Sequence, residues 1–346
     1  MPMLDQPSEG GRLGRILLYG KGKTKKTTWA VKAAEAGFNV FHIDGDDGAH
    51  ILYQPGILSE EARKRVLTIN VVDTFERAVF ASFMARFCKA GTTGFTWDEQ
   101  DKQIVLGLRN SEHTFVKIEP PKFTSNDVVI IDSWTRLAAS TLFQFAKEHS
   151  IDLADAAKVE WDGYGFQGRF LDFVLKSLSA FPCHVIVIGH ATVYEKRSKD
   201  QKTILSQTTQ PISSTGPHGA KLADFFSDVF FFEKMSDTAY YIRTSGSQDR
   251  MGGSRHFDAG HLKMEEFPIS KLFEKLGSTP SGAKNLGAEF IPKGVIQEVA
   301  QVKPIALGSK QTISSLGNGA AKAEVVPAKP AIVSSGGLAS RIKGLS

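Results

Sequence analysis

The chain has 346 residues, of which 41% are hydrophobic and 23% charged, so it is neither collagen-like nor wholly disordered. Lysine and arginine exceed aspartate and glutamate by 42 to 37, a surplus that permits contact with nucleic acid without requiring it. Cys88 and Cys183 lack zinc or disulfide spacing. No run approaches the roughly 18 apolar residues of a membrane span, and the first residues lack a signal-peptide pattern. We expect a cytoplasmic protein without membrane contact.

The length predicts one large α/β domain, because a single hydrophobic core stops growing at about 250 to 300 residues. We expect a flexible leader over 1–12 and a folded domain over 13–276. Glycine, alanine, serine, proline and lysine dominate from residue 277 onward, and aromatic residues nearly vanish. This composition predicts a disordered, basic tail over 277–346.

The first predicted elements form a strand, a turn, a helix and a second strand. The apolar run 15–19 ends in glycine and lysine, as a buried strand entering a tight turn does. A helix is predicted over 26–36, and a strand over 38–44 leads into an acidic turn. Further along, residues 73–90 have apolar positions about one turn apart, namely Phe75, Val79, Phe83 and Phe87, which predicts an amphipathic helix with Asp73 as its N-cap.

The middle of the chain alternates strands with helices. An inserted β-hairpin is predicted over 95–119. Residues 127–132 hold four β-branched residues and end in aspartate, which is typical of a parallel strand buried on both faces. Helices over 135–149 and 165–181 and a strand over 184–189 follow.

The last part of the folded domain is less regular. Residues 193–217 are polar and predict a long mobile loop, whereas 228–232 and 239–244 predict an antiparallel pair at the sheet edge. The alternation as a whole implies a mainly parallel, twisted sheet with helices on both faces. Such sheets bind ligands at the carboxyl ends of their strands.

Residues 20–27 follow the spacing GxxxxGK[ST] of a phosphate-binding P-loop, except that Lys25 stands where the second glycine belongs. Glycine there lets backbone N–H groups face the phosphates, whereas lysine has a Cβ in the way. Lys26 would reach the β- and γ-phosphates of ATP, and Thr27 would bind Mg²⁺. The alternative is a basic surface turn. The predicted cofactor-binding residues are Gly20, Lys21, Gly22, Lys23, Thr24, Lys25, Lys26, Thr27 and Thr28.

Other polar residues follow predicted strands. Asp132 would act as a Walker B carboxylate that holds Mg²⁺ through water, although a strand-ending aspartate can also be a cap. One of Asp44, Asp46 and Asp47 could polarise the attacking water, and we favour Asp46, although turns are rich in aspartate for local reasons. His190 could sense the γ-phosphate, a capping histidine being the alternative.

Basic residues near the last strands could act as arginine fingers across a subunit interface, although such side chains are more often solvated surface. The candidates are Arg243, Arg250 and Arg255, of which we retain Arg243. The predicted catalytic residues are Lys26, Asp46, Asp132, His190 and Arg243.

Basic and aromatic residues indicate a nucleic-acid surface. The segment 194–202 holds four basic residues, and Trp161, Tyr164 and Phe166 with Arg169 stand before a predicted helix. Solvated loops and core packing are the alternatives. The predicted nucleic-acid contacts are Tyr164, Arg169, Lys196, Arg197 and Lys199.

The order of P-loop, acidic turn, strand with Asp132, strand ending at His190 and edge strands with Arg243 resembles the RecA-like ATPases of bacteriophages, in particular the single-strand-annealing or recombination ATPases described as AAA-domain proteins. The resemblance covers about residues 12 to 260. It implies a RecA-like core that binds Mg-ATP between subunits of a ring or filament. It also implies DNA-stimulated hydrolysis, single-stranded DNA at about 158–169 and 193–217, and a single-strand-binding protein at the tail, in the cytoplasm of an infected host.

Two other functions compete with this one. Lys21 and the segment FHIDGDD are similar to the deviant Walker ATPases of the ParA and MinD family, but Ser-Trp-Thr after Asp132 departs from that family's turn. The third candidate is a nucleotide-binding scaffold with little turnover, because Lys25 puts the rate of hydrolysis in question.

Overall fold

The computed structural model describes residues 12–90, 93–97, 104–106, 113–151, 161–198, 203–247, 249–258, 260–282 and 287–292. The strands are β1 Arg15–Gly20, β2 Asn39–Asp44, β3 Val66–Asn70, β4 Phe95–Trp97, β5 Ile104–Leu106, β6 His113–Ile118, β7 Asp127–Asp132, β8 His184–Arg197, β9 Ile204–Pro211, β10 Asp228–Lys234, β11 Tyr240–Arg243, β12 Gly253–Ser254, β13 His261–Lys263 and β14 Ala288–Pro292. The α-helices are α1 Lys26–Val31, α2 Glu60–Lys64, α3 Val79–Lys89, α4 Trp134–Glu148, α5 Trp161–Ser179, α6 Gly216–Leu222 and α7 Ile269–Lys275. The short 3₁₀-helices are η1 Lys32–Ala34, η2 Ala49–Tyr53, η4 Pro120–Lys122 and η6 Ala223–Phe225.

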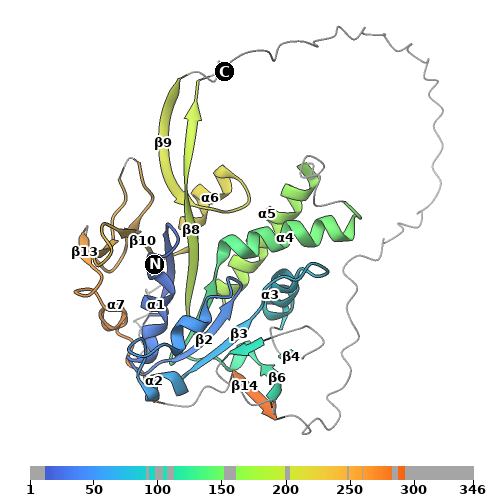
Figure 1. The fold of residues 1–346 in the computed structure, drawn as a ribbon, viewed down its shortest axis with the longest axis vertical. Coiled ribbons are helices and arrows are strands. Elements are labelled where there is room, and N and C mark those ends of the chain that lie inside the picture. Colours follow the sequence, from blue (N-terminus) through green and yellow to red (C-terminus); the bar gives the residue numbers. More distant parts are fainter. Residues whose placement is uncertain are drawn as a thin grey trace, which may run out of the picture. The chain divides into compact units, whose positions relative to one another are not determined.

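The larger sheet has the strand order β13-β11-β10-β1-β8-β7-β2-β3-β5 (Figure 1). From β10 to β3 neighbouring strands run parallel. The strands β11 and β13 extend one side of the sheet in antiparallel fashion, and β5 does the same on the other. This arrangement confirms the predicted fold class of a mainly parallel sheet with an antiparallel edge.

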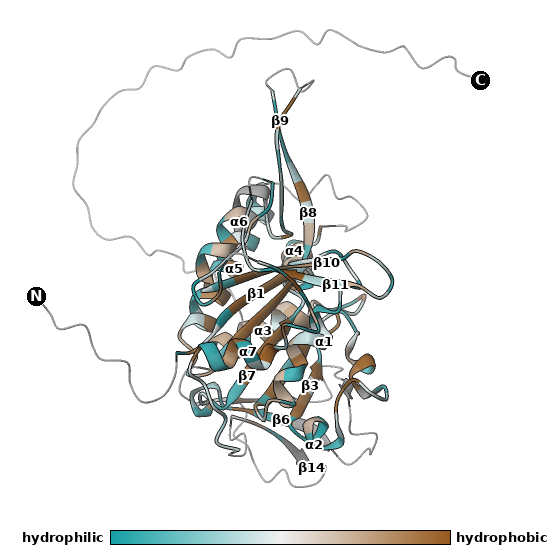
Figure 2. Cartoon of the chain, turned by 90° about the vertical axis from the view of Figure 1, so that its left-hand side faces the viewer, coloured by the Kyte–Doolittle hydropathy of each residue, from teal (hydrophilic) through white to brown (hydrophobic). Residues whose placement is uncertain are grey.

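Helices cover both faces of this sheet because successive side chains of a strand point to opposite sides. Leu17 lies in the apolar cluster that includes residues of α3, α4 and α5. Its neighbours Ile16 and Leu18 lie in the other cluster, with residues of α1, α2 and α7. Both faces are therefore dry, which explains why the central strands are apolar almost throughout (Figure 2).

The prediction of a mobile loop over 193–217 is wrong. The strand β8 continues beyond the sheet to Arg197, and β9 returns antiparallel to it, so the two form a hairpin that projects from the sheet (Figures 1 and 2). The helix α6 follows. Most residues of the projecting part are exposed on both faces. The hairpin is therefore held by the hydrogen bonds between its two strands rather than by apolar burial, and its sequence shows no alternation of apolar and polar residues.

The predicted insertion over 95–119 is also organised differently. Strands β4 and β6 pair antiparallel in a separate sheet, whereas β5 pairs with β3 of the main sheet. The third strand of the separate sheet is β14, which pairs with β6. Residues 288–292, expected in the disordered tail, therefore belong to the fold, and Arg12 of the expected leader donates its N–H to the Leu276 carbonyl. Residues 1–11 and 293–346 lie outside the described residues.

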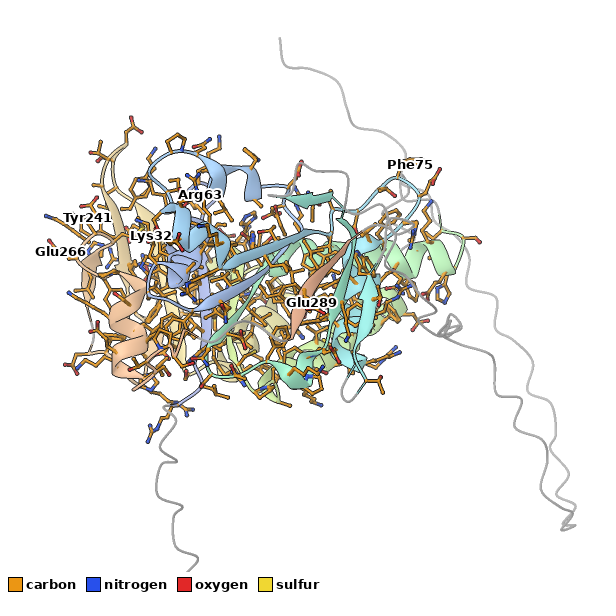
Figure 3. All side chains as sticks on the ribbon, turned by 90° about the horizontal axis from the view of Figure 1, so that it is seen from below. Lys32, Arg63, Phe75, Tyr241, Glu266 and Glu289 are labelled. Atoms are coloured by element: carbon orange, nitrogen blue, oxygen red, sulfur yellow. The ribbon has the colours of Figure 1, made fainter. Side chains whose placement is uncertain are left out.

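Two helix starts differ from expectation. The helix α3 begins at Val79, and Asp73 is not its N-cap, although its carboxylate accepts the Phe80 N–H at 3.0 Å. Phe75, expected on the apolar face of that helix, lies before it and is 92% exposed (Figure 3). The helix α5 already includes Trp161, so the aromatic residues expected before a helix lie in its first turns.

Replacing Phe230 by alanine should lower the free energy of unfolding by about 3 to 5 kcal/mol, because its fully buried ring packs edge-on against Trp29 and Phe267. Denaturant unfolding measures this loss. The matched control Phe75→Ala should change stability by less than about 0.5 kcal/mol. Equal losses in the two variants would contradict the described core.

Candidate nucleotide site

Strand register brings the predicted site residues to one edge of the sheet. Gly20, the last residue of β1, stands beside His190 of β8. Asp132, the last residue of β7, stands beside Asp44 of β2. Because these strands are parallel, the P-loop, the acidic turn and the β7 carboxylate all emerge at the carboxyl edge.

The loop between β1 and α1 turns through residues other than glycine. Gly20 itself is required by close approach, because a Cβ there would lie 2.2 Å from the Phe232 carbonyl oxygen. Lys23 and Lys25 adopt the left-handed conformation, with φ of 60° and 62°. The expected obstacle at Lys25 is therefore present, and the chain accepts the conformation that glycine normally supplies there.

Lys26 folds its ammonium back into this loop. Its Nζ donates to the Gly20 carbonyl at 3.1 Å, to the Lys21 carbonyl at 2.8 Å and to Thr24 Oγ1 at 3.2 Å. The side chain is nearly buried. Burial lowers the pKa of Lys26 to about 8, against the opposing effect of the Asp132 and Asp46 carboxylates.

Thr27 and Asp132 meet across the carboxyl edge. The Thr27 hydroxyl donates to Asp132 Oδ2 at 2.5 Å, although β8 lies between β1 and β7 in the sheet. His42 Nε2 lies 3.4 Å from the same oxygen, and its Nδ1 lies 3.4 Å from Thr68 Oγ1. Sequence reasoning missed His42 and Thr68, whose only signal was a polar residue at a buried strand position.

The three aspartates of the acidic turn have different surroundings. Asp44 is fully buried and its carboxylate accepts the N–H groups of Asp46 and Ala49, so it shapes the turn. Burial raises the pKa of Asp44. Asp47 accepts the side-chain amide of Asn70 at 2.6 Å. Asp46 faces Arg136 and His190, which favours it over its two neighbours as the polar group that points into the site.

Arg136 and His190 both approach Asp46. Arg136 Nε donates to Asp46 Oδ1 at 2.9 Å, and His190 Nε2 lies 3.7 Å from Oδ2. The His190 backbone N–H donates to Thr135 Oγ1 at 2.9 Å. Burial, and then the Lys26 cation, lower the pKa of His190, whereas Asp46 raises it. Arg136 was missed because an arginine in the first turn of a helix has no distinguishing sequence pattern.

The arginine candidates contact residues outside this cluster. Arg243 donates its Nε to Glu233 Oε2 at 2.5 Å, and this pairing lowers the pKa of Glu233. The Arg250 guanidinium stacks over the Phe231 ring at 4.7 Å. Arg255 donates its N–H to the Ser227 carbonyl, just before the amino end of β10, so it lies at the opposite edge of the sheet.

The predicted nucleic-acid residues divide between α5 and the hairpin. Tyr164 and Arg169 are exposed in the first half of α5, and Lys196 and Arg197 are exposed on β8. The Arg197 guanidinium forms two hydrogen bonds to Glu195. The two segments meet at the foot of the hairpin, by which we mean residues 212–214 directly after β9. There Ser214 Oγ donates to the Tyr164 carbonyl at 3.4 Å. Lys199 and residues 158–160 lie outside the described residues.

A hydrogen-bonded chain connects this foot to the end of β7. Trp134, two residues after Asp132, donates its indole N–H to Ser213 Oγ at 3.0 Å. Ser213 Oγ lies 2.7 Å from His218 Nδ1, and His218 Nε2 lies 3.0 Å from Asp172 Oδ1 of α5. The main-chain N–H of Ile212 also donates to the His190 carbonyl at 2.8 Å. The hairpin is thus attached to residues of the nucleotide edge.

The chemistry of the edge fits a triphosphate with magnesium. Lys26 provides a cation whose partners are oxygens of the loop, and Thr27 and Asp132 provide the oxygen ligands that Mg²⁺ prefers. Within the described ranges no three His, Cys, Asp or Glu side chains cluster as a metal site of their own.

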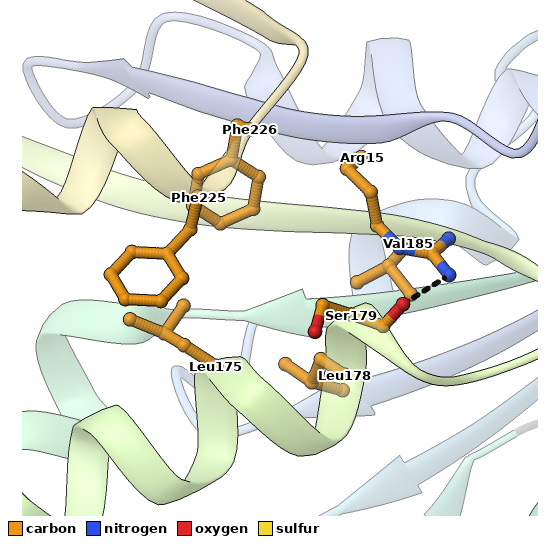
Figure 4. Close-up of a pocket in the computed structure, with 7 residues that line it drawn as sticks. All are labelled: Arg15, Leu175, Leu178, Ser179, Val185, Phe225 and Phe226. Atoms are coloured by element: carbon orange, nitrogen blue, oxygen red, sulfur yellow. Dashed lines mark hydrogen bonds between the residues drawn. The ribbon is translucent and has the colours of Figure 1, made fainter. Parts of the chain in front are cut away.

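A small cavity lies elsewhere. It measures about 10 Å³ and is lined by Leu175, Leu178, Phe225, Phe226 and the Arg15 side chain (Figure 4). The Arg15 guanidinium donates to the Ser179 carbonyl, and Arg15 is the first residue of β1, at the amino edge of the sheet. A space of this size holds about one water molecule, so it offers no ligand site.

A protein family and solved structures are similar to this chain. The family model described as an AAA domain matches residues 14–256. Among solved structures, the chain is similar to the crystal structure of the RadB recombinase, with a TM-score of 0.38 and 15% sequence identity, over 75% of this chain and 91% of that chain. No curated protein sequence matches. In the part of the chain that the structure describes, no helix is long and apolar enough to cross a membrane.

The affinity for ATP should fall by about tenfold between about pH 7.5 and about pH 9. Lys26 has a pKa of about 8, so its side chain is protonated below that pH. Above that pH the amine must take up a proton before it can attract phosphate. Calorimetric titrations across this range measure the change. In Lys26→Arg the guanidinium stays protonated, so whatever affinity remains should not follow this profile. An unchanged profile in that variant would refute the assignment.

Proposed function

Because this chain belongs to the AAA-domain family of P-loop NTPases, we propose that it binds and hydrolyses Mg-ATP at the carboxyl edge of its main sheet and that single-stranded DNA stimulates the hydrolysis. The family supports nucleotide binding and hydrolysis in general. The residue roles and the DNA partner are the proposal.

One observation carries the assignment of the site: the Thr27 hydroxyl donates to the Asp132 carboxylate at 2.5 Å. A basic surface turn has no reason to place its threonine against a carboxylate two strands away. A Mg²⁺ site does, because the threonine hydroxyl would bind the ion and the carboxylate would hold it through water. The nearly buried ammonium of Lys26 beside this pair strengthens the case.

The proposed roles follow from these positions. Lys26 would leave its loop carbonyls and neutralise phosphate oxygens, while Thr27 and Asp132 would hold Mg²⁺. When bound, the ion neutralises charge that develops on the phosphates. Asp46 would orient the attacking water and accept its proton, with Arg136 holding the carboxylate in place through its hydrogen bond to Oδ1. His190 would report the state of the site to the hairpin that begins at the next residue.

Exposed aromatic and basic side chains support the DNA partner. Trp161 is 87% exposed at the start of α5, and Tyr194 is 44% exposed on β8. Aromatic rings of this kind stack on bases, and neighbouring lysines attract the phosphates. The hydrogen bond from Ser214 to Tyr164 places both segments at one foot, so a single strand that contacts both would act on the attachment of the hairpin.

Other expectations stay predictions. A homo-oligomer with Arg243 acting across the interface would require Arg243 to leave Glu233. A single-strand-binding protein at the C-terminal tail also stays a prediction, since residues 293–346 lie outside the described residues. A bacteriophage origin and a function in the host cytoplasm stay predictions too.

Replacing Asp132 by asparagine should reduce the gain in ATP affinity that Mg²⁺ provides by about 10- to 100-fold, because the carboxylate proposed to hold the ion loses its charge. Titrating ATP with and without Mg²⁺ separates this effect from phosphate binding. Asp47→Asn changes a carboxylate that instead pairs with Asn70, so its magnesium dependence should stay as in the wild type. Equal effects in both variants would contradict the assigned ligands.

Single-stranded DNA should raise the ATPase rate of the wild-type chain, and the double variant Tyr194→Ala/Lys196→Ala should lose most of this stimulation while keeping its basal rate. The slope of the logarithm of DNA affinity against that of salt should fall by about one for the lost lysine. Lys64→Ala, an exposed lysine on α2 that pairs with Glu61, is the control.

Several results would decide against this function. If no DNA stimulates turnover and none binds at low salt, the DNA partner is wrong. If ATP binds without turnover, the scaffold alternative holds instead. Loss of ATP-driven dimerisation in Lys21→Ala would favour the ParA-like alternative.

A further inference from the structure

The lysine in place of the P-loop glycine has an unusual environment. Lys25 is the N-cap of α1, with φ of 62° and ψ of 23°. This left-handed conformation is unfavourable for a residue with a Cβ, and no side-chain hydrogen bond caps the helix there. Some other contact is needed to favour the turn that the loop requires.

Such a contact comes from the edge of the sheet. The Lys25 ammonium lies 4.0 Å from the centroid of the Tyr240 ring, a cation–π geometry. Tyr240 is on β11 and shares a face with Ile242, which lies in the apolar cluster that contains Trp29 of α1. The ring therefore stands on the face that α1 covers. The lysine opposite it on β10, Lys234, is paired with Asp237 at 2.7 Å.

We propose that Tyr240 is a positioning residue of the P-loop: by holding the Lys25 ammonium, it stabilises the left-handed turn that a glycine would otherwise provide, and so sets the affinity for the triphosphate. The proposal rests on the nucleotide-binding function proposed above. It requires no contact between Tyr240 and the nucleotide. A loop held in its binding conformation before the ligand arrives loses less entropy on binding.

A double-mutant cycle on the full chain tests this role, with calorimetry of ATP and of ADP and with thermal unfolding of the nucleotide-free protein. Tyr240→Leu should weaken both affinities by about two- to fivefold, the range of an exposed cation–π contact. Tyr240→Phe keeps the ring and should bind as the wild type does. Lys25→Met keeps the Cβ without the charge, leaves β11 intact and should reproduce the loss.

The decisive variant is Lys25→Gly. Glycine adopts the left-handed turn unaided, so adding Tyr240→Leu to Lys25→Gly should change neither affinity. Tyr241→Leu is the matched control, because that ring is on the opposite face of β11, against His261. It should bind nucleotide normally.

Four outcomes would overturn the proposal. Unchanged affinity in both Tyr240→Leu and Lys25→Met would show that the contact has no effect on the loop. A loss that persists when Tyr240→Leu is added to Lys25→Gly would assign the ring to the nucleotide instead. If the folded wild type binds no nucleotide at all, the proposed function fails as well. If nucleotide binding is abolished in Lys26→Ala but unchanged in Tyr240→Leu, only the proposed role of Tyr240 is refuted.

Discussion

Parallel pairing in a fixed register is the constraint on which the site depends. Asp44, Asp132 and Ile188 stand in one row across β2, β7 and β8, and Gly20 pairs with His190 in the row formed by β1 and β8. A slip of one residue in any of these strands would turn its side chains to the other face. The apolar residues that fill both faces oppose such a slip, so the core also fixes the distance between Thr27 and Asp132.

Much of the central sheet could be predicted, because its strands are buried on both faces and therefore form continuous apolar runs. The hairpin β8–β9 and the strand β14 could not. The outer part of the hairpin is exposed, so its backbone ladder needs no apolar pattern. The strand β14 follows a glycine- and serine-rich stretch and pairs with β6, about 170 residues earlier, a pairing that local sequence does not encode.

The site shows the same division between local and distant information. The P-loop spacing and the strand-ending Asp132 are local patterns, and the structure brings Thr27 and Asp132 together. Asp46, His42 and Arg136 acquire their surroundings only from strands and helices that are remote in sequence. Lys25 violates a local rule, and the compensating ring of Tyr240 lies more than 200 residues away. Violations of this kind are expected at functional sites.

The series of hydrogen bonds that runs from Trp134 through Ser213 and His218 to Asp172 has a direction. An indole N–H can only donate, so Ser213 accepts from Trp134 and has its own hydroxyl hydrogen left for His218 Nδ1. The neutral imidazole with its hydrogen on Nε2 then donates to Asp172, and every group in the series is satisfied. The joint at which the hairpin meets the end of β7 therefore carries its hydrogens in one order, from the indole of Trp134 to the carboxylate of Asp172.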